Sequence, residues 1–396
     1  MPFANVSTFE VISCFVISLL AFVTSMTNVY LEGANSTTID ATLPCATIVI
    51  AISLNCLGII FLAKKVKRES LIWTWTVLHL ILLRLPSTFE TLMSHTDDRA
   101  RSHNLLMMLS WNVLRCNSLG IDAIHQNFEL LRAFSYIFYL PTLISGPIVN
   151  YGDFRIMEIR ATKRYFSLTL GIVRCLFVAA LVEIWQHLFR SSHFEEHYNR
   201  WTLYGVCLSQ AATFYGLHRF MFGLSIEIGT FHGIQMPNVP RCIFRISSVR
   251  EQARYFDNGM HKFLSKYIYR RSSSQTFLAK SKNVAVTSLF VILWHGIERH
   301  VLLWVVVNYI LMHCEKGIDH LLKQKFIKNQ SASNQARLKA IIGANLWIPS
   351  MLSNFTLLTG FEIGIKFFEK TYLMPSAYLT LMSCMYCLHI VVQKVS

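Results

Sequence analysis

Long apolar runs recur along the whole chain and leave few folds open to it. Hydrophobic residues make up 53% of the 396 residues, charged residues only 15%, and the mean hydropathy is +0.41. A run of about 20 apolar residues can cross a bilayer as a helix, which satisfies its own backbone hydrogen bonds there. The sequence therefore predicts an all-α polytopic membrane protein.

Nine stretches are long and apolar enough to be candidate membrane segments. They are Phe9–Tyr30, Thr42–Ala63, Ser70–Leu85, Tyr165–Phe189, Thr202–Phe222, Val284–Trp294, Val301–Met312, Ala340–Leu358 and Tyr372–Val392. Between Leu105 and Tyr151 lie shorter apolar pieces, for which we expect re-entrant or half-spanning backbone. We expect about 8–11 transmembrane helices and a single membrane domain over residues 1–396, because no repeat or flexible linker divides the chain.

The chain is strongly basic, with 37 Lys and Arg residues against 22 Asp and Glu residues and a net charge of +15. The basic residues gather in loops beside apolar runs, at Lys64–Arg68, at Arg155–Arg164 and between Arg241 and Lys282, which is the positive-inside pattern. The sequon Asn35-Ser36-Thr37 fits the opposite, lumenal side. The charge therefore indicates topology and attraction to membrane lipid or an acyl-CoA phosphate, and we expect no nucleic-acid partner.

One histidine lies inside an apolar run, in Ser288-Leu289-Phe290-Val291-Ile292-Leu293-Trp294-His295-Gly296. An ionisable side chain at membrane depth is costly, so His295 is a functional candidate. Burial disfavours the imidazolium and leaves a neutral ring that can accept a proton. The alternative is a histidine that only forms a hydrogen bond between helices.

Asp257 follows Arg254-Tyr255-Phe256 and lies 38 residues before His295. A carboxylate can orient an imidazole, fix its tautomer and stabilise its protonated form. The pattern equally allows a salt bridge from Asp257 to Arg254.

Two upstream apolar segments contain residues that are unusual at membrane depth: proline and glycine in one, and an arginine in the other. Pro141, Gly146 and Pro147 interrupt the run that contains Tyr136 and Tyr139, which predicts broken backbone around a cavity or, alternatively, an interfacial turn with an aromatic belt. In the second segment, Arg115 needs a partner in apolar surroundings, and Asp122 is the candidate.

The ten cysteines lie mostly in apolar runs and indicate packing rather than a disulfide framework. Cys242 differs, because it follows Arg241 in a basic stretch after Pro237 and Pro240. Flanking arginines favour a thiolate, which can bind a metal or haem or accept an acyl group.

Together these motifs resemble the membrane-bound O-acyltransferase family, and within it the protein-acylating branch. The matching stretches are Arg241-Cys242, Arg254–Asp257, Lys266–Tyr269 and Trp294-His295-Gly296, with Tyr139-Leu140-Pro141, Gly146-Pro147, Leu352-Ser353-Asn354 and Gly360–Gly364. The likeness covers residues 105–396 as the family core, whereas residues 1–100 match only in hydropathy, as N-terminal transmembrane helices. Ala253 and Phe361 depart from the branch, at positions where we expect an aromatic and a polar residue.

The resemblance implies an endoplasmic-reticulum enzyme with the family's fold around a central cavity. It implies transfer of a long-chain acyl group, palmitoyl by analogy, from acyl-CoA to the N-terminal cysteine amine of a secreted, Hedgehog-like signalling protein. His295 and Asp257 take the catalytic positions, and Cys242 takes that of a haem-ligating cysteine. No cofactor is required for catalysis, and we expect no metal. Arg254 and Asn354 are candidate substrate-binding residues, with Lys262 and Lys266 as further cations for the CoA phosphates.

Three other interpretations stay open. A lipid or sterol O-acyltransferase of the same family would use the same histidine chemistry. A catalytically silent membrane regulator would not need both His295 and Asp257. A transporter also uses broken helices, but the sequence shows no inverted repeat.

Overall fold

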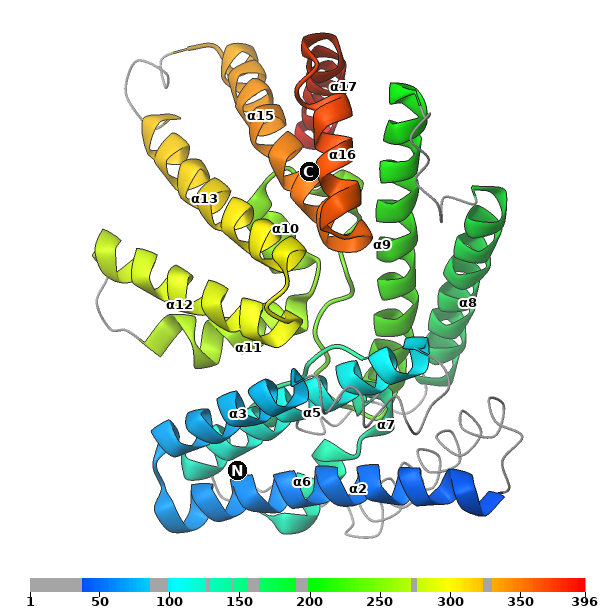
Figure 1. The fold of residues 1–396 in the computed structure, drawn as a ribbon, viewed down its shortest axis with the longest axis vertical. Coiled ribbons are helices and arrows are strands. Elements are labelled where there is room, and N and C mark those ends of the chain that lie inside the picture. Colours follow the sequence, from blue (N-terminus) through cyan, green and yellow to red (C-terminus); the bar gives the residue numbers. More distant parts are fainter. Residues whose placement is uncertain are drawn as a thin grey trace. The chain divides into compact units, whose positions relative to one another are not determined.

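The computed structural model describes residues 38–85, 99–125, 129–143, 146–154, 164–189, 199–271, 276–322 and 330–395, and every regular element in these ranges is a helix. The α-helices are α2 (Thr38–Phe61), α3 (Glu69–Leu83), α5 (Arg99–His125), α6 (Leu130–Ile137), α7 (Leu140–Leu143), α8 (Arg164–Leu188), α9 (Arg200–Phe231), α10 (Val249–Tyr255), α11 (Asn258–Tyr267), α12 (Phe277–His295), α13 (Arg299–Leu322), α15 (Ala332–Thr359), α16 (Phe361–Thr371) and α17 (Pro375–Val395) (Figure 1). Short helical turns are η1 (Leu62–Val66), η2 (Tyr151–Asp153), η4 (Ile243–Arg245) and η5 (Tyr269–Arg271).

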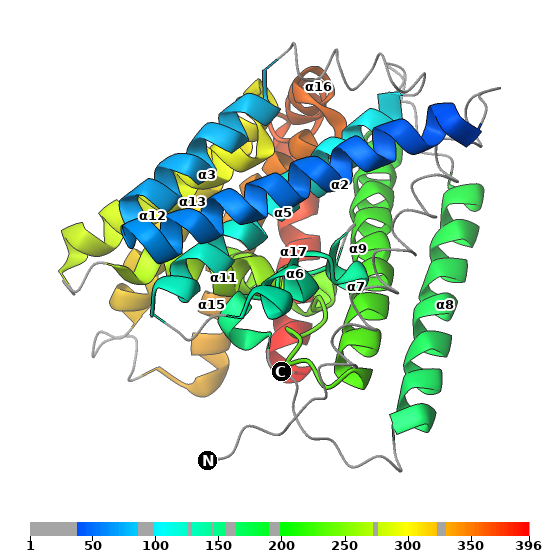
Figure 2. The same cartoon turned by 90° about the horizontal axis from the view of Figure 1, so that it is seen from below.

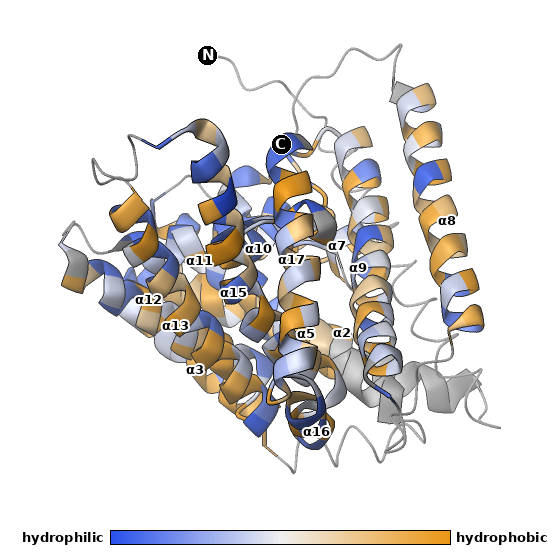
Figure 3. Cartoon of the chain, turned by 90° about the horizontal axis from the view of Figure 1, so that it is seen from above, coloured by the Kyte–Doolittle hydropathy of each residue, from blue (hydrophilic) through white to orange (hydrophobic). Residues whose placement is uncertain are grey.

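Five of the described helices are long and apolar enough to cross a membrane, and they confirm the prediction of an all-α polytopic membrane protein. The candidate spans are Val49–Val66, Tyr165–Leu188, Arg299–Leu322, Ala332–Thr359 and Pro375–Lys394. Apolar residues predominate along α8 and α13 (Figure 3). The predicted run Phe9–Tyr30 and the sequon lie outside the described residues, so the total number of spans stays a prediction.

The chain forms two compact units. Unit 1 comprises residues 1–172 and 224–237, and unit 2 comprises residues 173–223 and 238–396. The expected assignment of all 396 residues to one domain stays a prediction.

In unit 1, α2 and α3 form a helical hairpin that lies against α5 (Figure 2). The hairpin turns at Lys67, whose left-handed φ of 54° ends η1 and lets its N–H reach the Leu62 carbonyl at 2.9 Å. Gly120 lets α5 approach closely, because a Cβ there would lie 2.5 Å from Ile59. The Asn117 amide donates to the Thr76 hydroxyl at 2.8 Å, so a polar pair ties α5 to α3.

The segment from Leu105 to Tyr151 corrects two sequence-based expectations. Its first part is not a set of short apolar pieces but the continuous helix α5, buried from residue 110 to residue 122. Arg115 does not pair with Asp122: its guanidinium donates to the Tyr136 carbonyl and lies 4.9 Å from the centre of the Tyr136 ring. Asp122 instead accepts the Gly152 N–H at 2.8 Å. The ring face and carbonyl of Tyr136 are partners that hydropathy does not reveal.

In unit 2, α15 packs against α13, α16 and α17. The core that joins α9, α15, α16 and α17 consists of Leu203, Cys207, Ile348, Leu352, Phe355, Phe367 and Leu381. Gly360, with φ of 92°, ends α15 and begins α16. The chain turns sharply there, so α16 folds back and Gly364 lies against Thr356 of α15.

Gly364→Ala is expected to destabilise unit 2, because an added Cβ would lie 2.2 Å from the Thr356 hydroxyl oxygen. Overpacking of this kind costs about 1–3 kcal/mol. Thermal unfolding of purified protein in detergent measures the change. The matched control is Gly317→Ala in α13, where no heavy atom lies within 4 Å and stability should be unchanged or slightly raised. Equal melting temperatures for both variants would contradict the close contact.

Candidate active site

His295 is the last residue of α12, and its position is set by the glycine that follows. Gly296 has φ of 114°, a conformation that L-residues rarely adopt, and its N–H closes the helix on the Ile292 carbonyl at 2.9 Å. The helix therefore ends at the imidazole, and α13 begins at Arg299. The half-buried ring meets two indoles edge to face, Trp294 at 4.3 Å and Trp304 at 5.3 Å between ring centres.

Trp304 joins His295 to a polar network between α13, α15 and α10. The indole N–H of Trp304 donates to the Asn354 side-chain oxygen at 2.9 Å, and the Asn354 amide donates to the Ser350 carbonyl at 2.8 Å. The Ser350 hydroxyl lies 2.9 Å from the Asn308 oxygen and 3.3 Å from the Gln252 oxygen. The Asn308 amide donates in turn to the Ser353 hydroxyl at 3.1 Å.

The structure thus brings His295 close to one predicted residue and adds others that the motifs did not indicate. Asn354, a candidate wall residue, accepts a hydrogen bond from the same Trp304 indole that meets the imidazole edge to face. Trp304, Asn308 and Ser350 were not among the sequence candidates. The available signal was Asn308, an amide inside the apolar run of α13 that needs a partner at membrane depth.

Asp257 begins α11 as its N-cap. The Oδ1 atom accepts the Met260 N–H at 2.8 Å, in the capping geometry that aspartate favours. The alternative salt bridge is wrong for these described residues, because no ion pair joins Asp257 to Arg254. The exposed Arg254 guanidinium lies 5.9 Å from the centre of the Tyr255 ring. Asp257 and His295 belong to the same unit, and their pairing stays a prediction.

Burial raises the pKa of Asp257 from 3.8 to about 6, and the N–H groups of Met260 and Gly259 oppose the change. The low dielectric around the carboxyl disfavours the charged form, whereas the helix N-terminus favours it. Burial and the positive charges of Arg254 and Arg270 lower the pKa of His261, which lies one turn further along α11.

The N-terminus of α10 is held by Glu315, a buried carboxylate on α13. Glu315 accepts the Val249 N–H at 2.6 Å, the Arg250 N–H at 3.1 Å and the Arg250 Nε–H at 3.0 Å. The same guanidinium pairs with Asp319 one turn further on. Asp257 lies two residues beyond the end of α10, so this cluster helps to set the position of the candidate catalytic carboxylate.

Cys242 lies in the loop that leads into η4, half-buried and flanked by Arg241. Arg241 fixes the loop in two ways: its N–H donates to the Tyr255 carbonyl at 3.0 Å, and its guanidinium lies 4.7 Å from the centre of the Tyr255 ring. The Cys242 thiol is next to the Tyr215 hydroxyl. The loop is therefore joined to the end of α10, close in sequence to Asp257.

The upstream motif lies in unit 1, where its backbone is surrounded by protein. Tyr136 and Tyr139 are buried, and their hydroxyls bond the Val149 carbonyl and the His232 ring, each at 2.7 Å. An interfacial aromatic belt is therefore the wrong interpretation for these two residues. The stretch from Gly146 to Asn150 forms no helix and is buried, as broken backbone in a membrane protein must be. The expected central cavity stays a prediction.

Comparison with known proteins agrees with these motifs. The model of MBOAT, the membrane-bound O-acyltransferase family, matches residues 61–354, which include Asp257, His295 and Asn354. The chain is 28% identical over 307 residues to protein-cysteine N-palmitoyltransferase Rasp of Drosophila melanogaster, covering 72% of this chain and 61% of that protein. It is 26% identical over 362 residues to protein-cysteine N-palmitoyltransferase HHAT of Mus musculus, covering 83% of this chain and 72% of the relative.

A third relative is the mouse protein-cysteine N-palmitoyltransferase HHAT-like protein, 24% identical over 260 residues, which are 60% of this chain and 51% of the relative. The chain thus spans less than two thirds of the length of the Drosophila relative. The resemblance to the family and to its protein-acylating branch is confirmed.

Asp257→Asn is expected to raise the melting temperature at pH 6 and above, and the difference should shrink as the pH falls toward 3.8. The folded pKa of about 6 lies above the ordinary 3.8, so wild type loses stability as the pH rises from 3.8 to 6, where the unfolded carboxyl is ionised and the folded one still holds its proton. An amide oxygen still caps α11 but carries no charge. Melting curves from about pH 4 to pH 8 measure the effect. A variant that is less stable than wild type at pH 8 would contradict this account of the carboxyl.

Proposed function

The chain belongs to the membrane-bound O-acyltransferase family, and we propose that it is an acyltransferase of the protein-cysteine N-palmitoyltransferase type. It transfers a long-chain acyl group, palmitoyl by analogy, from acyl-CoA to the N-terminal cysteine amine of a secreted, Hedgehog-like signalling protein. The reaction takes place in the endoplasmic-reticulum membrane. The observation that carries the proposal is His295 at the broken end of α12, beside a polar network and inside the region that the family model matches.

His295 acts as the general base. The amine nitrogen adds to the thioester carbonyl, the carbon–sulfur bond breaks, and the CoA thiolate leaves. The neutral imidazole takes the proton from the amine and passes it to the thiolate, so atoms and charge balance. Help of this kind contributes about 10²–10⁴-fold to the rate.

Asp257 stabilises the positive charge that develops on the imidazole. This role requires the ionised carboxylate, so the rate of acyl transfer decreases as the pH falls through about 6. Arg254 and Lys262 are exposed and suited to the CoA phosphates, and Asn354 is a polar wall of the substrate path. Lys266 is a weaker candidate, because its ammonium already donates to the Tyr267 hydroxyl at 2.9 Å.

The sulfur atom of Cys242 is a suitable ligand atom for haem. A half-buried thiol flanked by Arg241 can give a thiolate ligand, and the guanidinium of Arg241 suits a propionate. Cys242 would supply the sulfur ligand, and no step of acyl transfer passes through the haem.

Purified wild type is expected to show a Soret band that Cys242→Ala loses. Cys207→Ala is the control, because that thiol is buried in the unit 2 core and no haem could reach it. A colourless wild type, or a band that persists without Cys242, would rule out haem ligation at this residue.

Acyl transfer in microsomes tests the proposed reaction. Labelled palmitoyl-CoA and a peptide with an N-terminal cysteine are supplied to wild type, His295→Ala and Asp257→Ala at matched expression. Wild type is expected to label the peptide, and both variants should lose at least a hundredfold in rate. The control is His320→Ala, a histidine at the exposed end of α13 that should keep full activity.

The identity of the labelled acceptor, peptide or lipid, distinguishes the remaining interpretations. Labelled endogenous lipid with an unlabelled peptide would favour a lipid or sterol O-acyltransferase. No transfer to either acceptor would favour a silent membrane regulator. Wild-type transfer that survives the loss of His295 would overturn the general-base assignment.

A further inference from the structure

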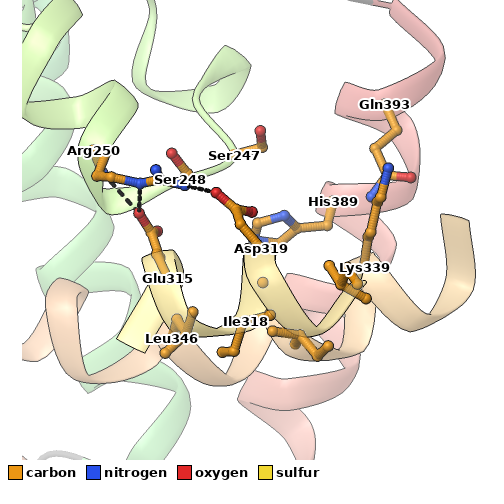
Figure 4. Close-up of a pocket in the computed structure, with 13 residues that line it drawn as sticks. Ser247, Ser248, Arg250, Glu315, Ile318, Asp319, Lys339, Leu346, His389 and Gln393 are labelled. Carbon is orange, nitrogen blue, oxygen red and sulfur yellow. Dashed lines mark hydrogen bonds and ion pairs between the residues drawn. The ribbon is translucent and has the colours of Figure 1, made fainter. Parts of the chain in front are cut away.

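A polar pocket of about 490 Å³ lies among three candidate membrane-spanning helices of unit 2, and His295 is not among its lining residues (Figure 4). Its lining residues come from α13, α15, α17 and the start of α10: Ser247, Ser248, Arg250, Glu315, Ile318, Asp319, Leu322, Lys339, Ile342, Gly343, Leu346, His389 and Gln393. Asp319, Lys339 and Gln393 all lie within about two helical turns of the ends of their helices. Because these helices are candidate membrane spans, we expect the pocket at the depth of the lipid headgroups.

His389 in this pocket lacks a partner. The side chain is only 2% exposed, and its Nε2 atom has no hydrogen-bond partner among the residues that the structure describes. Gly343 makes room for the ring, because a Cβ there would lie 2.7 Å from two imidazole atoms. Buried polar atoms nearly always have a partner, so Nε2 indicates a group that the pocket receives from outside the chain.

The two walls of the pocket differ in charge. Lys339 and Gln393 join His389 on the wall formed by α15 and α17, where their nitrogen atoms can surround an anionic oxygen (Figure 4). On the opposite wall, Glu315 and Asp319 share one guanidinium, that of Arg250. Two carboxylates against one arginine leave one negative charge, and Lys339 is the cation on the opposite wall, where the nearby Glu251 carboxylate also acts on His389.

We infer that the pocket binds the headgroup of a phospholipid with an ethanolamine group. Its phosphate is held by His389, Lys339 and Gln393, and its ammonium by the half-exposed Asp319. The paired charges fit a zwitterion better than the multiple negative charges of a CoA. A choline headgroup prefers an aromatic cage, and none of the 13 lining residues is Phe, Tyr or Trp.

The basic sequence between the helices that line the pocket indicates the cytosolic leaflet. Between α13 and α15 the sequence carries Lys323, Lys325 and Lys328, and α17 ends beside Lys394. Basic connections between membrane helices face the cytosol. The pocket includes neither His295 nor Asp257, and Lys339 and His389 lie outside the Arg250, Glu315 and Asp319 cluster that positions α10.

Lipid-dependent stability of the full chain tests the inference. Delipidated protein in detergent is titrated with phosphatidylethanolamine, phosphatidylcholine or phosphatidic acid, and the melting temperature is recorded. Phosphatidylethanolamine is expected to raise it most, since a ligand of the folded state stabilises by mass action. Lys339→Ala and His389→Leu should each weaken the apparent affinity at least tenfold. The control Arg337→Ala removes an exposed charge from the same helix and should leave it unchanged.

Each alternative result overturns the inference in a recognisable way. Equal effects of all three lipids would mean that only the bulk bilayer acts. A larger effect of phosphatidic acid would mean that the pocket prefers a net anion. Glycerophosphoethanolamine without acyl chains serves as a further arm, and an equal shift with it would make the ligand a soluble phosphate ester. If His389→Leu does not fold, the Lys339→Ala titration alone decides the outcome.

Discussion

Backbone hydrogen bonding inside the bilayer is the constraint on which this structure depends. Each N–H and C=O at membrane depth must find a partner within the protein, so the described chain is built from helices. A helix can end inside such a protein only where packing surrounds the break. The positive φ angles of Gly296 and Gly360 make two such ends, and the first leaves His295 at a helix terminus rather than on a helix face. The candidate catalytic ring is thereby half-buried at the end of a helix.

Polar groups between the helices then restrict how unit 2 can pack. Asn308, Ser350, Asn354 and the Trp304 indole are matched across α13 and α15, and the Ser350–Gln252 bond extends the match to α10. Glu315 fixes the N-terminus of α10 through three hydrogen bonds. A network of this kind restricts the arrangement of the helices, because a shift of one helix leaves several polar groups unpaired. The short helix that precedes Asp257 is thus positioned at its N-terminus and at its middle.

Hydropathy predicted the all-α polytopic class and the helices around the described apolar runs, because the bilayer constraint acts on each segment separately. Contacts between segments were harder to predict from the sequence. We predicted that Arg115 pairs with Asp122, because a buried charge needs a partner of opposite charge. Its partners are instead the backbone carbonyl and the ring face of Tyr136. The Asn308–Ser350 bond joins residues 42 positions apart, and no local pattern records such a pair. His295 was a candidate because it is ionisable and lies in an apolar run, whereas the catalytic roles of His295 and Asp257 came from family resemblance, which adds information that periodicity lacks.

Asp257 has a structural role as the N-cap of α11 and a proposed chemical role beside His295, and only the second role requires a negative charge. Capping α11 requires an acceptor oxygen, and asparagine supplies one as well as aspartate does. The charge is therefore unnecessary for the fold, and burial makes it costly, as the raised pKa of about 6 indicates. Near neutral pH the carboxyl is nevertheless mostly ionised, so the protein carries a negative charge that its own helix does not need. A developing imidazolium in the same unit is a use for that charge, and acyl transfer by His295 is the reaction that would create it.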